Sequence, residues 1–248
     1  MRARRILVLG ATSAIAQAYA RQRAARGAVF MLVGRNDDRL RAIVADLLAY
    51  GATGAECFVT ELAAIADIER SLHELWMRFP DPDEALIAYG TLGEQAMAHQ
   101  DLATVRTLLD INFTSTALWI LGLLKQRRPD APLTLITIGS VAGDRGRATN
   151  FIYGAAKGGL DRLLEGLAQK NHGTPVRIIT IKPGFVDTPM TAAIDKRGPL
   201  WATPDQVAED ICRGVTKGKR LIYTPWYWWP IMTVIRHLPW FVFKRLKV

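Results

Sequence analysis

Three side chains that could carry proton chemistry follow one another in the second half of the chain: Ser140, Tyr153 and Lys157. Tyr153 and Lys157 are four residues apart, so they share one face of a helix if this segment is helical. There the ammonium group could stabilise a tyrosinate and lower the pKa of the phenol. The Ser140 hydroxyl could donate a hydrogen bond to a carbonyl oxygen on which charge develops. A Tyr and a Lys at this spacing are more often a surface pair, but the added serine in this order indicates a catalytic centre.

A candidate phosphate-binding turn lies near the N-terminus, where an apolar run ends in Gly10-Ala-Thr-Ser-Ala14-Ile15. A turn between a strand and a helix presents backbone N–H groups and the positive end of the helix dipole to a pyrophosphate. Small residues let the backbone approach such a ligand. An ordinary strand-to-helix turn would have much the same sequence, so this segment alone does not define a site.

The residues after the second apolar run bear on which dinucleotide would bind. An NAD-specific site usually carries an Asp or Glu at this strand end, for the ribose 2′-hydroxyl. Here Gly34 is followed by Arg35, with Arg39 one helical turn further on. A guanidinium matches the geometry of a phosphate, so the pattern favours NADP(H), with NAD(H) as the alternative. The alternative is that Arg35 is a solvated arginine at the start of a helix and binds no phosphate, which would give the same sequence.

Apolar runs alternate along the chain with stretches of helical periodicity, which is typical of repeated β-α-β units. The prediction is an α/β fold, a Rossmann-type doubly wound parallel sheet of about seven strands in the order 3-2-1-4-5-6-7, with helices on both faces. The expected strands are 5–10, 29–34, 55–59, 85–89, 133–139, 176–182 and 221–224. The expected helices are 15–26, 38–50, 65–79, 102–127, 151–169 and 205–215, the last one opened by Thr203 and Pro204. Ser140 would then lie at the carboxyl edge of the sheet, where open α/β folds bind ligands.

Composition narrows the alternatives. Half of the 248 residues are apolar, which is enough for one substantial core. The two cysteines, Cys57 and Cys212, cannot form a disulfide framework, so the cytoplasm is the expected location. The four histidines are scattered without paired ligands, and no metal site is expected. Eight Lys or Arg and no acid occur in 211–248, whereas the rest is nearly neutral, which indicates a local anionic partner and not a nucleic acid.

The last segment, 225–248, is predicted to be an aromatic and basic tail attached to a catalytic domain of residues 1–224. It holds four of the seven tryptophans, and Pro230 and Pro239 would each open a short helix. The residues expected on the apolar face of the first helix are Ile231, Val234, Ile235 and Leu238. The apolar run is too short to span a bilayer but suits a segment in an anionic membrane interface. An arm packed on a neighbouring subunit is the alternative.

From about Arg5 to Thr224 the chain resembles the short-chain dehydrogenases/reductases. The motifs that carry the resemblance are the turn at Gly10, Asn112 in Ile-Asn-Phe, Ser140, Tyr153-x-x-x-Lys157 and Pro183-Gly-Phe-Val-Asp-Thr188. The resemblance implies an enzyme that reduces a ketone to a secondary alcohol, and a homodimer or homotetramer.

The same resemblance assigns roles to the catalytic residues. Tyr153 would donate the proton in reduction, and Lys157 would also bind the nicotinamide ribose. Ser140 would hold the carbonyl oxygen, and Asn112 would order a water in a proton relay. The implied cofactor-binding residues are Gly10, Thr12, Ser13, Ala14, Ile15, Arg35, Glu61, Leu62, Ala88, Tyr89, Gly90, Tyr153, Lys157, Pro183, Gly184, Val186 and Thr188.

Departures from the family pattern concern cofactor affinity and leave the catalytic groups in place. Ala14 and Ala16 stand where a fuller fingerprint has glycines, and Glu61 replaces the usual Asp. The family's Asn-Asn-Ala-Gly stretch is replaced by Ala-Tyr-Gly-Thr at 88–91.

A narrower resemblance involves Ala88-Tyr-Gly-Thr-Leu-Gly93, Ser140-Val-Ala-Gly-Asp-Arg145, Ala148-Thr-Asn-Phe151 and the segment from Ile235 to Leu246. These strings resemble the branch of the family that reduces decaprenylphosphoryl-2-keto-β-D-erythro-pentofuranose. That branch implies a polyprenyl-phosphate-linked keto-pentose as substrate, met from the cytoplasm at the inner face of the membrane. The alternatives are a reductase of small soluble ketones or 3-oxoacyl substrates, and a non-enzymatic, membrane-docked NADP(H)-sensing protein.

Overall fold

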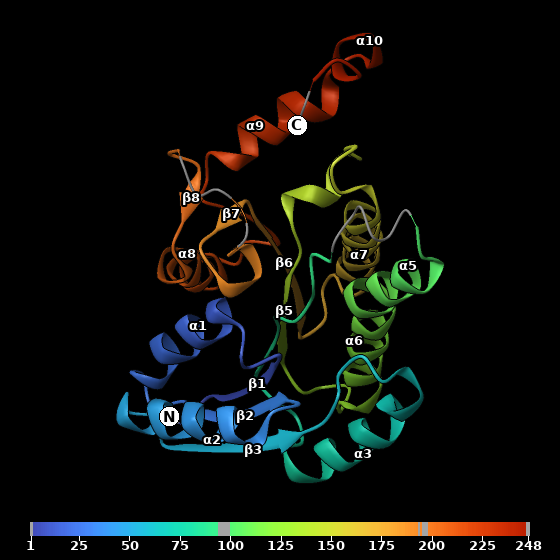
Figure 1. Ribbon diagram of the computed structural model, residues 1–248. Coiled ribbons are helices and arrows are strands. Elements are labelled where there is room, and N and C mark those ends of the chain that lie inside the picture. The colour runs from blue at the N-terminus through green and yellow to red at the C-terminus, as the bar shows by residue number, and fades with distance from the viewer. Residues whose placement is uncertain (1, 94–99, 193, 195–197, 247–248) are drawn as a thin grey trace.

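The computed structural model describes residues 2–93, 100–192, 194 and 198–246, and its centre is one parallel sheet (Figure 1). The strands pair in the order β3-β2-β1-β4-β5-β6-β9, each parallel to its neighbours. Their bounds are β1 Arg5–Leu9, β2 Val29–Gly34, β3 Gly54–Val59, β4 Glu84–Ile87, β5 Leu133–Ile138, β6 Val176–Pro183 and β9 Leu221–Thr224. Because β9 is the seventh strand of this sheet along the chain, the predicted order 3-2-1-4-5-6-7 and the fold class are confirmed.

Helices cover both faces of the sheet (Figure 1). One face carries α1 Ala14–Ala24, α2 Asp37–Ala49 and α8 Pro204–Thr216, and the other carries α3 Ile68–Arg78, α6 Ser115–Gln126 and α7 Phe151–Lys170. Successive strand residues point to opposite faces. Ile6 and Val8 of β1 therefore belong to one apolar cluster, and Leu7 and Leu9 belong to the other. Burial on both faces explains why the strands have continuous apolar sequences instead of alternating ones.

The segment predicted as one helix over 102–127 is continuous but contains a wider turn. α5 (Leu102–Leu109) passes through the π-helical turn η2 (Asp110–Thr114) into α6. By length and hydropathy the 25-residue stretch could cross a membrane. Trp119, Ile120 and Leu123 of α6 are fully buried in the core, whereas Leu118 and Leu121 are 38% and 45% exposed, so only one side of this helix packs on the sheet. The π-helical turn places Asn112 inside the protein.

The predicted helix over 65–79 begins as a 3₁₀ turn, η1 (Ile65–Asp67), and continues as α3. A separate two-stranded sheet, in which β7 (Phe185–Val186) pairs with β8 (Trp201–Ala202), was not predicted. Strands of two residues are too short to show a periodicity. The predicted start of α8 is confirmed, since the Thr203 and Gln206 side chains form a reciprocal capping box around Pro204.

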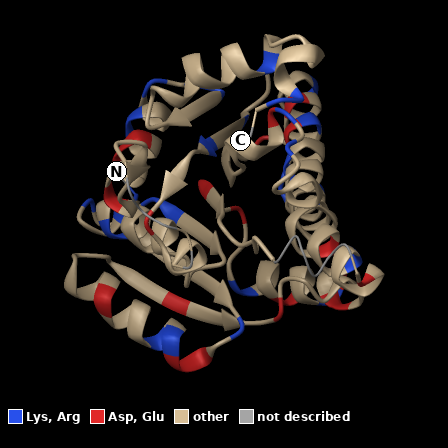
Figure 2. Cartoon of the chain, turned by 45° about the horizontal axis from the view of Figure 1, so that its top comes forward, with Lys and Arg blue, Asp and Glu red and all other residues tan. Residues whose placement is uncertain are grey.

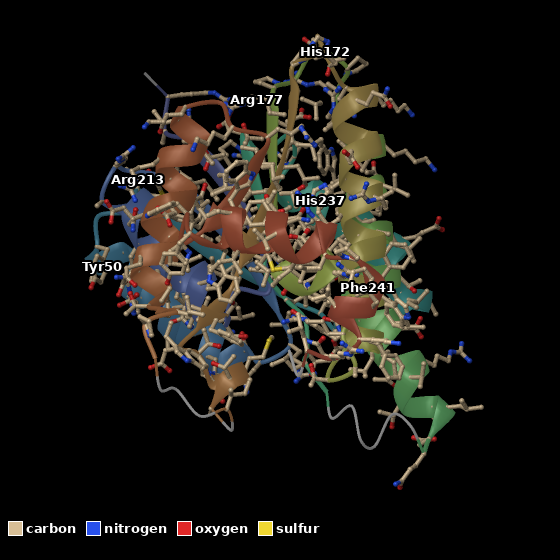
Figure 3. All side chains as sticks on the ribbon, turned by 90° about the horizontal axis from the view of Figure 1, so that it is seen from above. Tyr50, His172, Arg177, Arg213, His237 and Phe241 are labelled. Atoms are coloured by element: carbon tan, nitrogen blue, oxygen red, sulfur yellow. The ribbon has the colours of Figure 1, made fainter. Side chains whose placement is uncertain are left out.

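The C-terminal tail forms α9 (Trp228–His237) and α10 (Trp240–Phe243), which lie together at one end of the molecule (Figure 1). α9 begins two residues before Pro230, so the prediction that this proline opens the helix was wrong. A proline is tolerated there because the first N–H groups of a helix need no intrahelical acceptor. Seen from above, α9 runs across the molecule with His237 near its end and Phe241 just beyond (Figure 3). Residues 247 and 248 of the predicted tail lie outside the described residues.

Only part of the predicted apolar face of α9 is buried. Trp228 and Met232 pack with Val141 and Tyr223, and Ile231 and Ile235 lie half-buried beside them. Val234, which was expected on the same face, is 61% exposed.

Candidate active site

A cleft of about 540 Å³ opens at the carboxyl edge of the sheet, which is the size of a typical small-ligand site. Ser140, Tyr153, Lys157 and all of the predicted cofactor-binding residues line this one cleft. Asn112 lies just behind the wall of the cleft and does not line it. Segments that are far apart in the sequence meet here because the ends of parallel strands share one edge.

The proposed catalytic trio is held by β5 and α7. Ser140 lies two residues beyond the end of β5, and its Oγ accepts a hydrogen bond from the Ala142 backbone N–H at 3.1 Å. Tyr153 and Lys157 lie one turn apart on α7, with Lys157 Nζ 5.8 Å from the centre of the Tyr153 ring. Lys157 Nζ donates to the Ile138 carbonyl at 3.1 Å. Both side chains are buried, 9% and 4% exposed respectively, so water is largely excluded from this corner of the cleft.

The pKa of the phenol moves in the direction opposite to the one the sequence predicts. Burial raises the pKa of Tyr153 to about 12, against smaller lowering effects of the hydrogen bond with Ser140 and the charge of Arg147. Burial also lowers the pKa of Lys157 to about 8, with the Asp161 carboxylate acting against it. Burial is the largest effect on the pKa of Tyr153, and Lys157 Nζ is hydrogen-bonded to the Ile138 carbonyl. Tyr153 consequently keeps its proton at neutral pH, which is the form that a proton donor needs.

The side chain of Asn112, which belongs to the π-helical turn, forms hydrogen bonds with the loop after β4. Its Nδ2 donates to the Thr91 and Leu108 carbonyls at 2.8 and 2.9 Å, and its Oδ1 accepts from the Thr91 N–H at 3.1 Å. A Cβ on Gly90 would lie 2.8 Å from Asn112 Oδ1 and 3.6 Å from Lys157 Nζ. Glycine at this position therefore lets the backbone pass between the two side chains.

A buried ionic network continues from Lys157 away from the cleft. Asp161, one turn further along α7, lies 2.7 Å from Lys182 Nζ, which also contacts the Asp144 carboxylate. The Tyr223 hydroxyl donates to the second Asp144 oxygen at 2.8 Å. Burial raises the pKa of Asp161, and Lys182 opposes this effect. The sequence did not indicate this network, because its members come from the β5–α7 loop, α7, β6 and β9.

The predicted phosphate-binding turn is a tight turn between β1 and α1. Gly10 adopts a φ of +84°, and a Cβ there would lie 2.7 Å from the Tyr89 Cβ, so only glycine fits. The Ser13 N–H donates to the Gly10 carbonyl at 3.0 Å, which closes the turn before α1. Ser13 makes no side-chain cap for α1, so the first N–H groups of the helix remain available to an anion in the cleft.

Two arginines lie at the end of the cleft that the adenosine half of a dinucleotide would occupy. Arg35 and Arg39 both line the cleft, and the Asn36 side chain caps α2 between them. Arg35 Nη1 lies 3.1 Å from Glu61 Oε2, and both side chains are largely exposed. An exposed ion pair of this kind is weak, so a 2′-phosphate could compete for Arg35.

The Pro183–Thr188 segment and α9 close the opposite end of the cleft. Val186 lies in the short strand β7, and the Thr188 N–H donates to Thr191 Oγ1 at 3.2 Å. The Trp228 indole packs directly on Gly184, where a Cβ would lie 1.8 Å from Nε1. Trp228 also lines the cleft, so the predicted tail contributes to the site.

Sequence reasoning missed several residues that line the cleft, and they are Arg147, Asn150, Phe185, Met190, Ile194 and Trp228. Arg147 and Asn150 stand between Ser140 and Tyr153, which was the one available signal. Trp228 gave no signal, since its sequence neighbours are equally aromatic. Within the described ranges, no group of three or more His, Cys, Asp or Glu is arranged to hold a metal ion.

The fold and the cleft together define an α/β protein built to hold a dinucleotide at the edge of its sheet. The family model of the short chain dehydrogenases matches residues 4–198. An uncharacterized oxidoreductase of Mycobacterium tuberculosis is 35% identical over 244 residues, which cover 97% of this chain and 96% of the relative. An uncharacterized oxidoreductase of Streptomyces coelicolor is 35% identical over 250 residues, covering 99% and 96%.

The chain therefore belongs to the short-chain dehydrogenase/reductase family. It is an oxidoreductase that acts on CH–OH or C=O groups with a nicotinamide cofactor.

Solved structures share the fold at low sequence identity. A short-chain dehydrogenase from Sphingobium yanoikuyae in complex with NADPH superposes with a TM-score of 0.78 at 21% identity, covering 98% of this chain and 96% of that one. An actinorhodin polyketide ketoreductase with NADPH gives a TM-score of 0.77 at 20% identity, covering 90% and 95%. A 3-oxoacyl-[acyl-carrier protein] reductase from Brucella melitensis in complex with NAD gives 0.75 at 21% identity, covering 90% and 96%.

Proposed function

We propose that this protein is an NADP(H)-dependent reductase that converts a ketone to a secondary alcohol. The observation that carries the proposal is the convergence of Ser140, Tyr153 and Lys157 on the cleft beside the phosphate-binding turn. When bound, the nicotinamide supplies the hydride for the carbonyl carbon. Tyr153 donates the proton to the carbonyl oxygen, Ser140 holds that oxygen by a hydrogen bond, and Lys157 binds the nicotinamide ribose.

The preference for NADP(H) over NAD(H) rests on Arg35 and Arg39. Both guanidinium groups line the cleft at the end of β2, where no acid stands in the sequence to bind a ribose 2′-hydroxyl. Two of the solved structures with this fold are described with NADPH and one with NAD.

The reductase proposal is tested by following NADPH oxidation with a panel of ketones. Tyr153→Phe keeps the ring but removes the proton donor, so turnover should fall by at least about 100-fold while NADPH binding persists. Substantial residual turnover in this variant would refute the role of Tyr153. A wild-type protein that binds NADPH yet reduces no ketone would refute the reductase assignment.

For the substrate we propose the keto group of a polyprenyl-phosphate-linked pentose, reached from the cytoplasm at the inner face of the membrane. The support is the outer surface of the tail, where large aromatic side chains are exposed; these are Trp226, Trp229, Trp240 and Phe241, between 59% and 75% exposed. Arg236, Lys244 and Arg245 accompany them, and no acidic residue occurs on α9 or α10 (Figure 2). Such a surface suits an anionic membrane interface, and Trp228 places it beside the cleft.

This membrane contact is tested with a triple variant, Trp229→Ser, Trp240→Ser and Phe241→Ser, which leaves the buried Trp228 and Met232 in place. Wild-type protein should co-sediment with vesicles of anionic lipid, and the variant should not. If the variant still co-sediments, the tail is not the anchor. If neither protein binds vesicles but the variant loses a homodimer or homotetramer measured by light scattering, the surface is a subunit contact.

A reductase of small soluble ketones or 3-oxoacyl substrates is the second candidate. The ketoreductase and 3-oxoacyl-[acyl-carrier protein] reductase that share this fold give it weight. Efficient turnover of soluble ketones that is unchanged in the tail variant would favour it. The remaining alternative, a non-enzymatic NADP(H) sensor, is disfavoured because the family is enzymatic and Tyr153 and Lys157 are both in place.

A further inference from the structure

Arg147 is a partly desolvated cation in the wall of the cleft and forms no ion pair with a carboxylate of the described part of the chain. It lies in the loop between η3 (Val141–Gly143) and α7, and its charge acts on Tyr153. Its Nε is buried and has no hydrogen-bond partner among the described residues. Burial lowers the pKa of Arg147, and the Asp144 carboxylate that opposes this effect is already engaged by Lys182 and Tyr223. Because burying an unsatisfied charged group is costly, a ligand is the natural partner for this guanidinium.

Asn150 presents a second unsatisfied atom on the same wall. It occupies the N-cap position of α7 and lines the cleft, but its side chain does not cap the helix. Its Oδ1 is buried and has no partner among the described residues. The Asn150 N–H donates to the Arg147 carbonyl at 3.2 Å, so a tight turn holds the two residues together. An unpaired donor and an unpaired acceptor thus occur three residues apart on the loop that separates Ser140 from Tyr153, and both residues line the cleft.

We propose that Arg147 and Asn150 bind hydroxyl groups of the substrate next to the reacting carbonyl, so that the site takes a polyhydroxylated ketone of the ketose type. A hydroxyl both donates and accepts, so hydroxyls can satisfy the Arg147 donor and the Asn150 acceptor together. A thioester oxygen or a carboxylate only accepts, and it would leave Asn150 Oδ1 unpaired. An alkyl chain would leave both atoms unpaired. This inference rests on the proposed reduction of a ketone and specifies the substrate class of the same site.

The expected selectivity is large enough to measure. A hydrogen bond to a charged group contributes about 1.5–3 kcal/mol, which corresponds to roughly 10- to 100-fold in kcat/KM. Sites built to bind a hydroxyl discriminate strongly against analogues that lack it, because their own polar groups then stay unpaired.

The test compares three ketones with the same four-carbon skeleton: erythrulose, butanone and acetoacetate. NADPH oxidation is measured for the wild type, Arg147→Met and Asn150→Leu, with Arg26→Met as the control because Arg26 is exposed and does not line the cleft. The wild type should prefer erythrulose over both other ketones. Arg147→Met and Asn150→Leu should each lower kcat/KM for erythrulose by about 10- to 100-fold more than they lower kcat/KM for butanone, and should retain NADPH binding. A variant that fails to bind NADPH is replaced by Arg147→Gln or Asn150→Ala.

Each other outcome is decisive. Equal turnover of erythrulose and butanone, or unchanged erythrulose turnover in both variants, overturns the inference while the reductase assignment stands. A preference for acetoacetate shows that Arg147 binds an anion and also overturns it. If no ketone is turned over, the reductase assignment fails, and calorimetric titration of erythrulose into NADP⁺-loaded protein decides the inference. If the wild type binds erythrulose and Arg147→Met does not, the inference is supported. If both proteins bind erythrulose equally, or neither binds it, the inference is overturned.

Discussion

The Arg145 guanidinium lies 3.7 Å from the centre of the Phe243 ring and joins the loop after Ser140 to the far end of the tail. Its Nη1 also donates to the carbonyl oxygens of Ile235, Arg236 and Leu238, the last at 2.8 Å. These carbonyls lie in the last turn of α9 and at its C-cap residue Leu238, where the helix leaves carbonyl groups with few intrahelical donors. A single cation therefore satisfies the C-terminus of α9 and stacks on α10.

Replacing this cation should release the tail. Arg145→Met keeps most of the aliphatic chain but removes the charged donors, and we expect a loss of about 2 kcal/mol of stability. Trypsin should then cleave faster after Arg236, Lys244 or Arg245. Arg213→Met is the control, because Arg213 is 60% exposed and its ion pairs are with Glu209 and Asp210 of its own helix, away from the tail. Equal cleavage rates in the two variants would show that Arg145 does not hold the tail.

The second prediction concerns the pH dependence of catalysis. The Asp161 carboxylate raises the pKa of Lys157 against the burial that brings it down to about 8. Asp161→Asn removes this support, so the Lys157 ammonium loses its proton at a lower pH. The alkaline limb of the kcat/KM profile should move to lower pH, and kcat/KM at pH 8 should fall by roughly three- to tenfold.

Lys182 and Asp144 also bear on this test, because Lys182 contacts both Asp161 and Asp144. Asp46→Asn, which breaks only a partly exposed pair with Arg21, serves as the control for a lost carboxylate. If the pH profile of kcat/KM is the same in Asp161→Asn as in the wild type, and thermal stability is retained, Asp161 does not control the protonation of Lys157.

The third prediction addresses the choice between NADP(H) and NAD(H). Arg35→Asp should shift the ratio of kcat/KM values toward NADH by at least about tenfold, because a carboxylate repels a 2′-phosphate and can bind a 2′-hydroxyl. Glu61→Gln should act the other way and raise NADPH affinity up to about fivefold, because it frees Arg35 from an exposed ion pair. Initial rates with NADPH and with NADH measure the ratio for Arg35→Asp, and titration of protein fluorescence measures the NADPH affinities of both variants. Unchanged affinities in both variants would remove Arg35 from the 2′-phosphate site.

The fourth prediction tests the contact between the Pro183–Thr188 segment and α9. In Gly184→Ala the new Cβ would meet the Trp228 indole at 1.8 Å, so the buried Trp228 must move and α9 with it. We expect a loss of about 1–3 kcal/mol of stability and a higher KM for the ketone. Gly146→Ala is the matched control, because a Cβ on Gly146 meets nothing within 4 Å. If both variants behave alike, the Trp228 contact does not shape the site.

Much of the fold and part of the site were readable in the sequence because their signals are local. Alternating apolar runs and helical stretches predicted the seven strands, and their order is the one that the Rossmann-type doubly wound fold implies. Tyr153 and Lys157 share a helical face because they are four residues apart, and Gly10 marks a turn that needs a positive φ. Each of these signals depends on spacings of a few residues, which the chain fixes before it folds.

Only the tertiary structure showed the features that depend on contacts between residues far apart in the sequence. The pairing of Lys182 with Asp144 and Asp161, the Trp228 indole on Gly184, and the unsatisfied Arg147 and Asn150 have no counterpart in any local spacing. The direction of the Tyr153 pKa shift belongs to the same group, because it follows from how completely the surrounding elements exclude water. Burial is a property of the packed whole, so a sequence can place a phenol beside an ammonium group without revealing which effect prevails.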